Sequence, residues 1–249
     1  MKATYLFPLI ALALSAPLLA DEPEGIVLPF KQVSVSSPVL QDNIKDEEAE
    51  EGDQVKAGQV LAHLLNDREQ LEVERTQNQV KRAQWEYNGI KRLAAENDAT
   101  QESVIEKETD LTEAQLEYQA AIVALNEKTI KSPLSGVVVK RYKEPGESVD
   151  RSEKLFDIVN IDQVYIQFYI EPSLVEKIQV GDKIPVHFPA RNGGIEQYDA
   201  AVSFIAPVID AASGLYRVKL LLDNPNHDIR AGMRAEGDFD NPEKTASAH

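Results

Sequence analysis

The sequence predicts a mainly β protein: a β-sandwich module, an α-helical coiled-coil hairpin inserted into that module, and a following antiparallel β-barrel. Three observations predict this fold class. A short β-rich motif occurs twice, the residues between its two copies repeat apolar side chains every seven positions, and the last part of the chain consists of short alternating segments bounded by turn residues. Because the hairpin is long, we expect an elongated molecule.

The composition is that of a globular chain without a nucleic-acid partner. The 249 residues are 43% hydrophobic and 27% charged, and the formal net charge is -16. A phosphate backbone is neutralised by clustered Lys and Arg, so this charge balance predicts no binding of nucleic acid. The chain has no cysteine, which excludes disulfides, thiolate metal ligands and a cysteine nucleophile.

Residues 1–20 have the pattern of a secretory signal peptide. A lysine precedes an apolar stretch, Tyr5–Leu14, and Ala20 ends the segment. The apolar stretch is shorter than the ~20 residues that a membrane-spanning helix needs. We therefore expect export of a soluble mature protein. The alternative is an uncleaved N-terminal anchor, because Leu18 occupies a position where a small residue is expected.

The repeated motif predicts two halves of one β-module, residues 35–65 and 128–160. Residues 50–64 read EEGDQVKAGQVLAHL, and residues 144–158 read EPGESVDRSEKLFDI. Each copy has a glycine at a tight turn, then a valine, then an apolar strand. The turns of the two half-motifs are assigned to Gly52, Gly58, Gly136 and Gly146.

Residues 66–127 separate the two halves and predict two antiparallel helices. Apolar side chains recur every seven positions in two phases, one from Val73 to Ala94 and one from Val104 to Leu125, as in a coiled coil. Between the phases, residues 96–103 (ENDATQES) are suited to end one helix and cap the next. Each helix would have about 30 residues and a length of about 45 Å. A projection this long indicates contact with another protein.

Residues 161–240 predict an antiparallel β-barrel. Apolar and polar side chains alternate along residues 164–170, and turn signals recur down the remaining sequence. One short helix is expected within residues 171–182 because its apolar residues have helical spacing. The segments 21–34 and 241–249 are expected to be unpacked tails.

The sequence contains no set of residues suited to covalent chemistry. It lacks a G-x-S-x-G motif and a glycine-rich phosphate loop, and RNGG at residues 191–194 is interpreted as a hairpin turn. The four histidines are dispersed without a second ligand at metal-binding spacing: His63, His187, His227 and His249. Two methionines, Met1 and Met233, exclude a methionine-based copper site. We therefore predict no catalytic residue, no metal site, no cofactor and no enzymatic activity.

The order of signal peptide, split β-module, hairpin and β-barrel resembles the periplasmic adaptor family of Gram-negative bacteria, also called membrane fusion proteins or HlyD-like adaptors. The resemblance covers about residues 35–240. It rests on EEGDQVKAGQVLAHL, IKSPLSGVVVKRYKEPGESV, IQVGDKIPVHF and VKLLLDNPNHDIRAGMRAEGDF. The family's β-module is lipoyl-like, similar to biotinyl and lipoyl carrier domains. Here the hairpin occupies the turn that bears the modified lysine of a carrier, so the resemblance implies no prosthetic group.

The resemblance also implies a function. It implies an adaptor in the periplasm that links an inner-membrane transporter of the resistance-nodulation-division (RND) type to an outer-membrane channel in a tripartite efflux pump. Self-association as a trimer or hexamer is implied as well. Two alternatives stay open: an adaptor for an ABC-type exporter or a secretion system, and a free periplasmic binding or scaffolding module.

The tip of the hairpin differs from the family pattern. The family's tip often carries an Arg, a Leu four residues later and a Ser seven residues further on, and this chain has Gly89, Leu93 and Thr100 at that spacing. We assign partner binding to Gly89, Leu93, Asn97 and Thr100. Gly89 cannot supply a guanidinium, which puts docking to the usual type of channel in question.

A second difference from the family lies in the first half of the β-module. Strand positions that are aliphatic in the family are occupied here by Glu47, Glu48 and Ala49. Acidic residues in a run usually lie on a solvated face. We therefore expect a frayed edge strand at this point.

Overall fold

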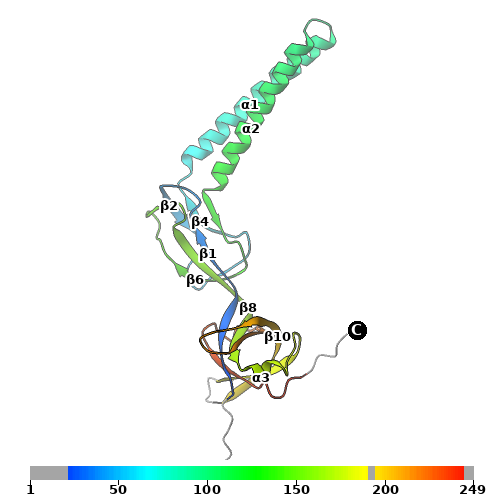
Figure 1. Ribbon diagram of the computed structural model, residues 1–249. Coiled ribbons are helices and arrows are strands. Elements are labelled where there is room, and N and C mark those ends of the chain that lie inside the picture. The colour runs from blue at the N-terminus through cyan, green and yellow to red at the C-terminus, as the bar shows by residue number, and fades with distance from the viewer. Residues whose placement is uncertain (1–21, 190–193, 244–249) are drawn as a thin grey trace, which may run out of the picture. The chain divides into compact units, whose positions relative to one another are not determined.

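The computed structural model describes residues 22–189 and 194–243 (Figure 1). The predicted signal peptide and three residues of the predicted RNGG turn lie outside these residues. The chain forms two compact units. The first unit contains the β-module and the hairpin, residues 27–165 and 222–233. The second contains the β-barrel residues 166–221 and 234–243 with the start of the described chain.

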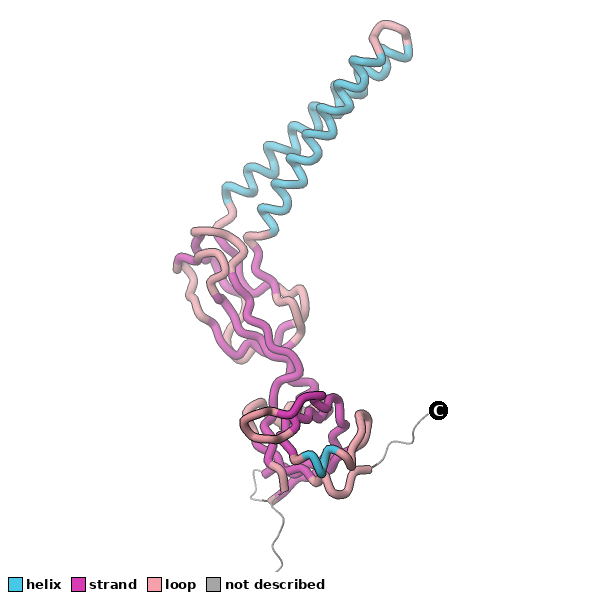
Figure 2. Tube along the Cα trace, viewed as in Figure 1, coloured by secondary structure: helices cyan, strands magenta, loops and turns pink. Residues whose placement is uncertain are grey.

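Two antiparallel groups of strands form the β-module (Figure 2). One is a four-stranded sheet in the order β5 (Thr129–Lys131), β4 (Val60–Leu64), β2 (Asp42–Glu47) and β7 (Ser148–Val149). In the other, β3 (Gln54–Val55) pairs with β6 (Gly136–Arg141), and β6 pairs with β8 (Lys154–Ile170). Both halves of the sequence contribute strands to each group, which confirms the β-sandwich predicted from the repeat.

The two half-motifs bind each other reciprocally. The N–H of Gly52 donates to the carbonyl of Val138 at 2.8 Å, and the N–H of Gly146 donates to the carbonyl of Ile44 at 2.8 Å. Both glycines have positive φ, +98° and +91°, in a region that residues with a Cβ rarely adopt. The glycine turn of each half-motif therefore forms a backbone hydrogen bond with a strand of the other half.

The repeat is longer than the aligned motif. Within the first half, Ser37-Pro38 precedes the motif copy at residues 50–64, and Ser132-Pro133 occupies the equivalent place before the copy at residues 144–158. Both serines are 2% exposed. The N–H of Gly58 donates to the carbonyl of Ser132 at 2.7 Å, and the N–H of Ser152 donates to the carbonyl of Ser37 at 2.9 Å. These Ser-Pro pairs are a second set of reciprocal contacts between the halves.

Gly136 is not a turn residue, which corrects the prediction. It is the first residue of β6, and a Cβ at this position would lie 2.2 Å from the carbonyl oxygen of Val159 on β8. Glycine is needed here because the backbones of β6 and β8 approach closely.

The core of the β-module is apolar and contains side chains from both halves. The buried residues are Val39, Ile44, Ala49, Val55, Leu61, Ala62, Leu64, Ile130, Val138, Val149, Leu155, Phe156 and Ile158. Such burial is the main driving force for folding of the module.

The hairpin consists of α1 (Asp67–Ala95) and α2 (Gln101–Asn126), which run side by side between β4 and β5 (Figure 1). The seam between the helices buries Thr76 of α1 and, on α2, Val104, Leu111 and Ala121. Val104 and Leu111 lie on the predicted seven-residue phase of α2, and Thr76 and Ala121 each lie three residues after a position of the predicted phases, Val73 and Tyr118. The predicted coiled-coil hairpin is therefore confirmed.

The barrel strands are β9 (Lys183–Pro189), β10 (Ile195–Ile209), β11 (Tyr216–Asp223) and β12 (Arg234–Gly237), with parts of β1 (Glu24–Ser36) and β8. Among the described residues, the order is β1-β12-β9-β10-β11-β8, and an additional β1–β8 pairing closes this run. Ile166, Phe168 and Ile170 of β8 are at most 1% exposed, as their alternation predicts. The short helix α3 (Pro172–Val175) lies within the predicted segment.

The prediction that residues 21–34 and 241–249 are unpacked tails is wrong for the parts of these segments that the structure describes. Strand β1 begins at Glu24 and pairs with β12, and Val27 is 1% exposed. Near the other end, Glu243 forms a β-bridge with Lys183. The described parts of both segments are held in place because they pair with barrel strands that are distant in sequence.

Candidate functional site

The tip of the hairpin is a tight, capped connection. Helix α1 ends at Ala95, Asn97 has a φ of +65°, and the N–H of Asp98 donates to the carbonyl of Leu93 at 2.8 Å. Thr100 precedes α2, and its hydroxyl oxygen accepts a hydrogen bond from the N–H of Ser103 at 3.1 Å. The Thr100 N-cap fixes the start of α2, and the left-handed backbone conformation of Asn97 ends α1.

Three of the four predicted tip residues are at the surface of the tip. Leu93 is 45% exposed, and Asn97 and Thr100 are exposed in the connection. Gly89 lies in α1, before the tip, and a Cβ built on it meets no atom within 4 Å. The structure therefore leaves room for a side chain at position 89. The apolar group offered at the tip itself is Leu93.

The base of the hairpin is tied to the β-module by Lys128. Its Nζ lies 2.5 Å from Asp42 of β2 and 3.1 Å from Glu69 of α1. Burial alone would lower the pKa of Lys128, but the hydrogen bonds to the two carboxylates outweigh it and raise that pKa. Lys128 therefore stays charged at neutral pH and links both ends of the hairpin to the sheet.

The acidic run in the first half of the module is not a frayed edge, which corrects the prediction. Strand β2 lies inside the four-stranded sheet, and the side chain of Glu47 is only 4% exposed. Arg141 of β6 contacts the Glu47 carboxylate and also Glu144, at 2.6 Å. Burial raises the pKa of Glu47, although Arg141 acts in the opposite direction. Glu47 can be buried in the sheet because Arg141, from the second half of the module, places a positive charge beside its carboxylate.

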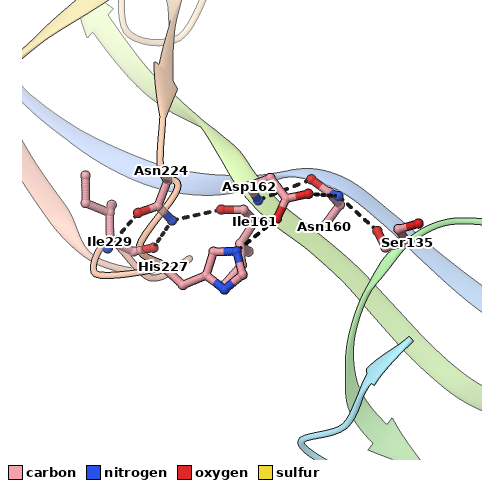
Figure 3. Close-up of polar contacts among 7 residues, drawn as sticks. All are labelled: Ser135, Asn160, Ile161, Asp162, Asn224, His227 and Ile229. Atoms are coloured by element: carbon pink, nitrogen blue, oxygen red, sulfur yellow. Dashed lines mark hydrogen bonds and ion pairs between the residues drawn. The ribbon is translucent and has the colours of Figure 1, made fainter. Parts of the chain in front are cut away.

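A polar cluster holds the β11–β12 loop against strand β8 (Figure 3). Asn224, which is 4% exposed, donates to the carbonyls of Ile161 and Ile229 at 2.8 Å each. His227 lies 2.9 Å from Asp162, and this contact lowers the pKa of Asp162 below its usual value. Asn224 and His227 lie in the motif VKLLLDNPNHDIRAGMRAEGDF, but the sequence did not indicate these contacts, because their partners on β8 lie about sixty residues earlier.

The barrel exposes an apolar patch, which we call the barrel patch. It consists of Tyr169 on β8 and Phe204, Val208 and Ile209 on β10; Val208 is 73% exposed. The guanidinium of Arg217 lies 5.8 Å from the ring of Phe204. Clustered apolar side chains of this kind often mark a protein contact.

The described histidines pair with carboxylates. His63 contacts Glu48 at 3.1 Å and His187 contacts Glu22 at 3.3 Å, in addition to the His227 contact. Within residues 22–189 and 194–243, no group of three His, Cys, Asp or Glu side chains is arranged to hold a metal ion. In the same residues, no helix combines the length and apolar character needed to cross a membrane.

Comparison with protein families identifies both units. Residues 32–160 match the CzcB-like barrel-sandwich hybrid domain, and residues 163–243 match the CusB-like β-barrel domain. The chain therefore belongs to the periplasmic adaptor, or membrane fusion protein, family, which confirms the resemblance seen in its sequence motifs.

Two relatives illustrate the level of sequence similarity. The cation efflux system protein CzcB of Alcaligenes sp. is 24% identical over 198 residues, covering 73% of this chain and 37% of the relative. The efflux pump periplasmic linker BepD of Brucella suis is 24% identical over 216 residues, covering 75% of this chain and 54% of the relative. The chain thus spans only part of the length of the relatives it matches.

Solved structures share the fold. A MacA–MexA chimeric protein that contains the Pseudomonas aeruginosa MexA α-hairpin domain aligns with a TM-score of 0.75 at 18% identity, covering 86% of this chain and 76% of that chain. ZneB from Cupriavidus metallidurans aligns with a TM-score of 0.53 at 19% identity, covering 87% and 96%.

Proposed function

We propose that the protein is a non-enzymatic periplasmic adaptor that joins an inner-membrane RND-type transporter to an outer-membrane channel in an efflux pump. The observation that carries this proposal is the attachment of the hairpin. Strands β4 and β5 pair with each other at the base of the helices, so the β-module is closed without the hairpin. Two long helices that their own module does not need are available to another protein.

Each partner is assigned to a separate surface. The tip, with exposed Leu93, is proposed to contact the channel, and the barrel patch is proposed to contact the transporter. The RND assignment is supported by the CusB-like barrel match and by a relative named as an efflux pump periplasmic linker. Metal cations are the first substrate class to test, because CzcB is named as a cation efflux system protein.

The test is affinity capture of the tagged protein from crosslinked Gram-negative cells, with and without the hairpin. The N–H of Leu64 donates to the carbonyl of Lys128 at 2.8 Å, so a two-residue Asn-Gly turn that joins these two residues can replace residues 65–127. A folding control is the thermal unfolding of the shortened chain.

We expect the intact protein to recover an inner-membrane transporter and an outer-membrane protein, and the shortened protein to lose only the latter. Recovery of an ABC-type exporter in place of an RND transporter would favour the first alternative. Recovery of no membrane protein by the intact chain would favour a free periplasmic module and contradict the proposal.

A further inference from the structure

Helix α1 carries an exposed tryptophan on the side that faces away from α2. Trp85 is 74% exposed, although tryptophan is a highly buried residue type on average. It follows Thr76, which is 1% exposed in the seam between the helices, by nine positions. At about 100° per residue, these two side chains point to opposite sides of α1. The packing of the hairpin therefore does not account for Trp85.

The side chains around Trp85 are cations and amides. Between residues 78 and 92, the positions within about 60° of Trp85 form one stripe along the outer side of α1. We call this set the Trp85 stripe: Asn78, Lys81, Arg82, Trp85, Asn88, Gly89 and Arg92. All of them except Gly89 are exposed. The stripe is about 21 Å long, and it contains three basic residues and no acidic residue.

The positive charge of the stripe is a local feature of a strongly acidic chain, whose formal net charge is -16. Glu86 lies beside the stripe, and its carboxylate is shared between Arg82 at 3.9 Å and Lys107 of α2 at 3.4 Å. Among the described residues, neither Lys81 nor Arg92 forms an ion pair with a carboxylate. The cations of the stripe are therefore available to an anionic ligand.

Gly89 leaves the ring of Trp85 open to a ligand. Side chains on an α-helix lean toward its N-terminus, so a side chain at position 89 would lean over residue 85, one turn earlier. Gly89 has no side chain, and a Cβ built there meets no atom within 4 Å. Glycine is otherwise one of the least favourable residues inside a helix. At this position it gives a ligand an unobstructed approach to the indole ring.

A flat ring bordered by amides and cations fits a glycan that carries carboxylates. The C–H groups on one face of a pyranose ring pack against an indole ring. The amides of Asn78 and Asn88 can donate and accept hydrogen bonds, as sugar hydroxyl and acetamido groups require. Lysine and arginine pair with carboxylates. The stripe therefore offers one suitable contact for each kind of group on such a ligand.

A membrane surface or a protein fits the stripe less well. A helix that lies in a membrane interface needs a wide apolar face, and the stripe has one large apolar side chain. A protein interface has a buried apolar core that is depleted in charged residues. The stripe contains no second apolar side chain to extend such a core around Trp85.

We propose that the Trp85 stripe binds peptidoglycan, with Trp85 against a sugar ring and the three cations against carboxylates of the peptide stems. Peptidoglycan combines sugars and carboxylates in one polymer and lies between the two membranes of a Gram-negative cell. The inference rests on the proposed function, because a protein that joins these membranes must pass through the peptidoglycan layer. It adds a partner that would hold the hairpin within that layer.

The test measures how much of the full-length exported protein sediments with purified peptidoglycan sacculi. We expect Trp85→Ala to weaken binding roughly tenfold and Arg92→Gln roughly threefold, because each removes one contact with the ligand. Gly89→Gln should weaken binding roughly threefold by covering the ring, although glutamine is the better helix former. Unchanged helical circular dichroism shows that each variant is folded. Wild-type binding by Trp85→Ala would overturn the proposal.

Two matched control variants lie on α1 outside the stripe. Leu71→Ala removes another apolar side chain, which is 67% exposed. Arg75→Gln removes another positive charge, whose Nε lies 2.8 Å from Glu72. Both should sediment like wild type. A loss of binding by either control as large as that of its stripe counterpart, Trp85→Ala or Arg92→Gln, would show that the stripe is not the site.

Changes to the ligand separate the chemistry of recognition from general adhesion. Sacculi whose carboxylates have been converted to amides, and chitin, a glycan without carboxylates, should each bind roughly tenfold more weakly than native sacculi. Vesicles of phosphatidylethanolamine and phosphatidylglycerol should show no binding that depends on Trp85. Equal binding to native and amidated sacculi, or Trp85-dependent binding to the vesicles, would overturn the proposal.

The single tryptophan gives an independent readout. Trp85 is the only tryptophan in the chain, so soluble fragments from lysozyme-digested sacculi should change its emission when they bind. Unchanged emission at fragment concentrations that release the protein from sacculi would contradict the contact. Absence of sacculus binding while both membrane partners are still captured would overturn this inference alone. Sacculus binding without capture of a membrane partner would overturn the proposed function instead.

Discussion

Replacing Arg141 with methionine should destabilise the β-module by leaving a buried carboxylate without its cation. The Glu47 side chain is 4% exposed, and among the described residues its Oε1 has no hydrogen-bond partner. Removing one member of a buried ion pair costs about 3–5 kcal/mol, because the remaining charge is uncompensated. Arg141 is itself 24% exposed, so water reaches the site, and we expect the lower end, about 3 kcal/mol.

The pH dependence of this loss has a defined sign. Burial already holds the pKa of Glu47 above its ordinary value, and removing Arg141 removes the contact that lowers it. A carboxyl whose pKa is higher in the folded than in the unfolded state binds its proton more tightly when folded. The destabilisation of Arg141→Met should therefore be largest near neutral pH and shrink as the pH falls through the raised pKa of Glu47.

The assay is urea unfolding of wild type and variant at several pH values. The double variant Glu47→Leu with Arg141→Met is the matched control, because replacing a buried ion pair by apolar side chains is often neutral or stabilising. If Arg141→Met unfolds like wild type at pH 7, or if its loss of unfolding free energy grows as the pH falls, Arg141 does not stabilise the buried Glu47 carboxylate in this way.

Four further predictions concern single substitutions. Gly136→Ala should destabilise the module by about 2 kcal/mol, because the added methyl would lie 2.2 Å from the Val159 carbonyl. Gly89→Ala, which meets no atom within 4 Å, should instead stabilise the hairpin by about 0.5–1 kcal/mol. A melting temperature of Gly136→Ala at or above that of wild type would contradict the first prediction, and one of Gly89→Ala below that of wild type would contradict the second. Thr100→Ala should cost about 1 kcal/mol through loss of the N-cap while Thr100→Ser retains it, as measured by the thermal loss of helical circular dichroism. Asn224→Ala should accelerate hydrogen exchange at the Ile229 amide, which donates to the Asn224 side chain at 3.1 Å, and unchanged exchange would show that the loop does not depend on this bond.

The parts of the fold that depend on local patterns could be predicted from the sequence. Both helices follow from heptads, and the connection between them follows from polar residues such as Thr100, which caps α2 as expected. The β-sandwich follows from a repeat in which Gly52 and Gly146 make equivalent contacts. These signals lie within a few residues of the structures that they specify.

The features that sequence reasoning missed depend on contacts between distant residues. Glu47 looks like a surface acid until Arg141, 94 residues later, is placed beside it. Glu24 looks like part of a tail, although it pairs with a strand whose Arg234 follows 210 residues later. The Asn224 cluster has the same origin, because its partners lie on another strand.

Site-specific photocrosslinking in cells tests the bridging role most directly. A photoreactive amino acid is placed at Leu93 in one variant and at Val208 in another, both of which are exposed. We expect the Leu93 variant to crosslink to an outer-membrane protein and the Val208 variant to crosslink to an inner-membrane transporter. Crosslinks from both positions to proteins of a single membrane, or to no membrane protein, would contradict an adaptor that joins two membranes.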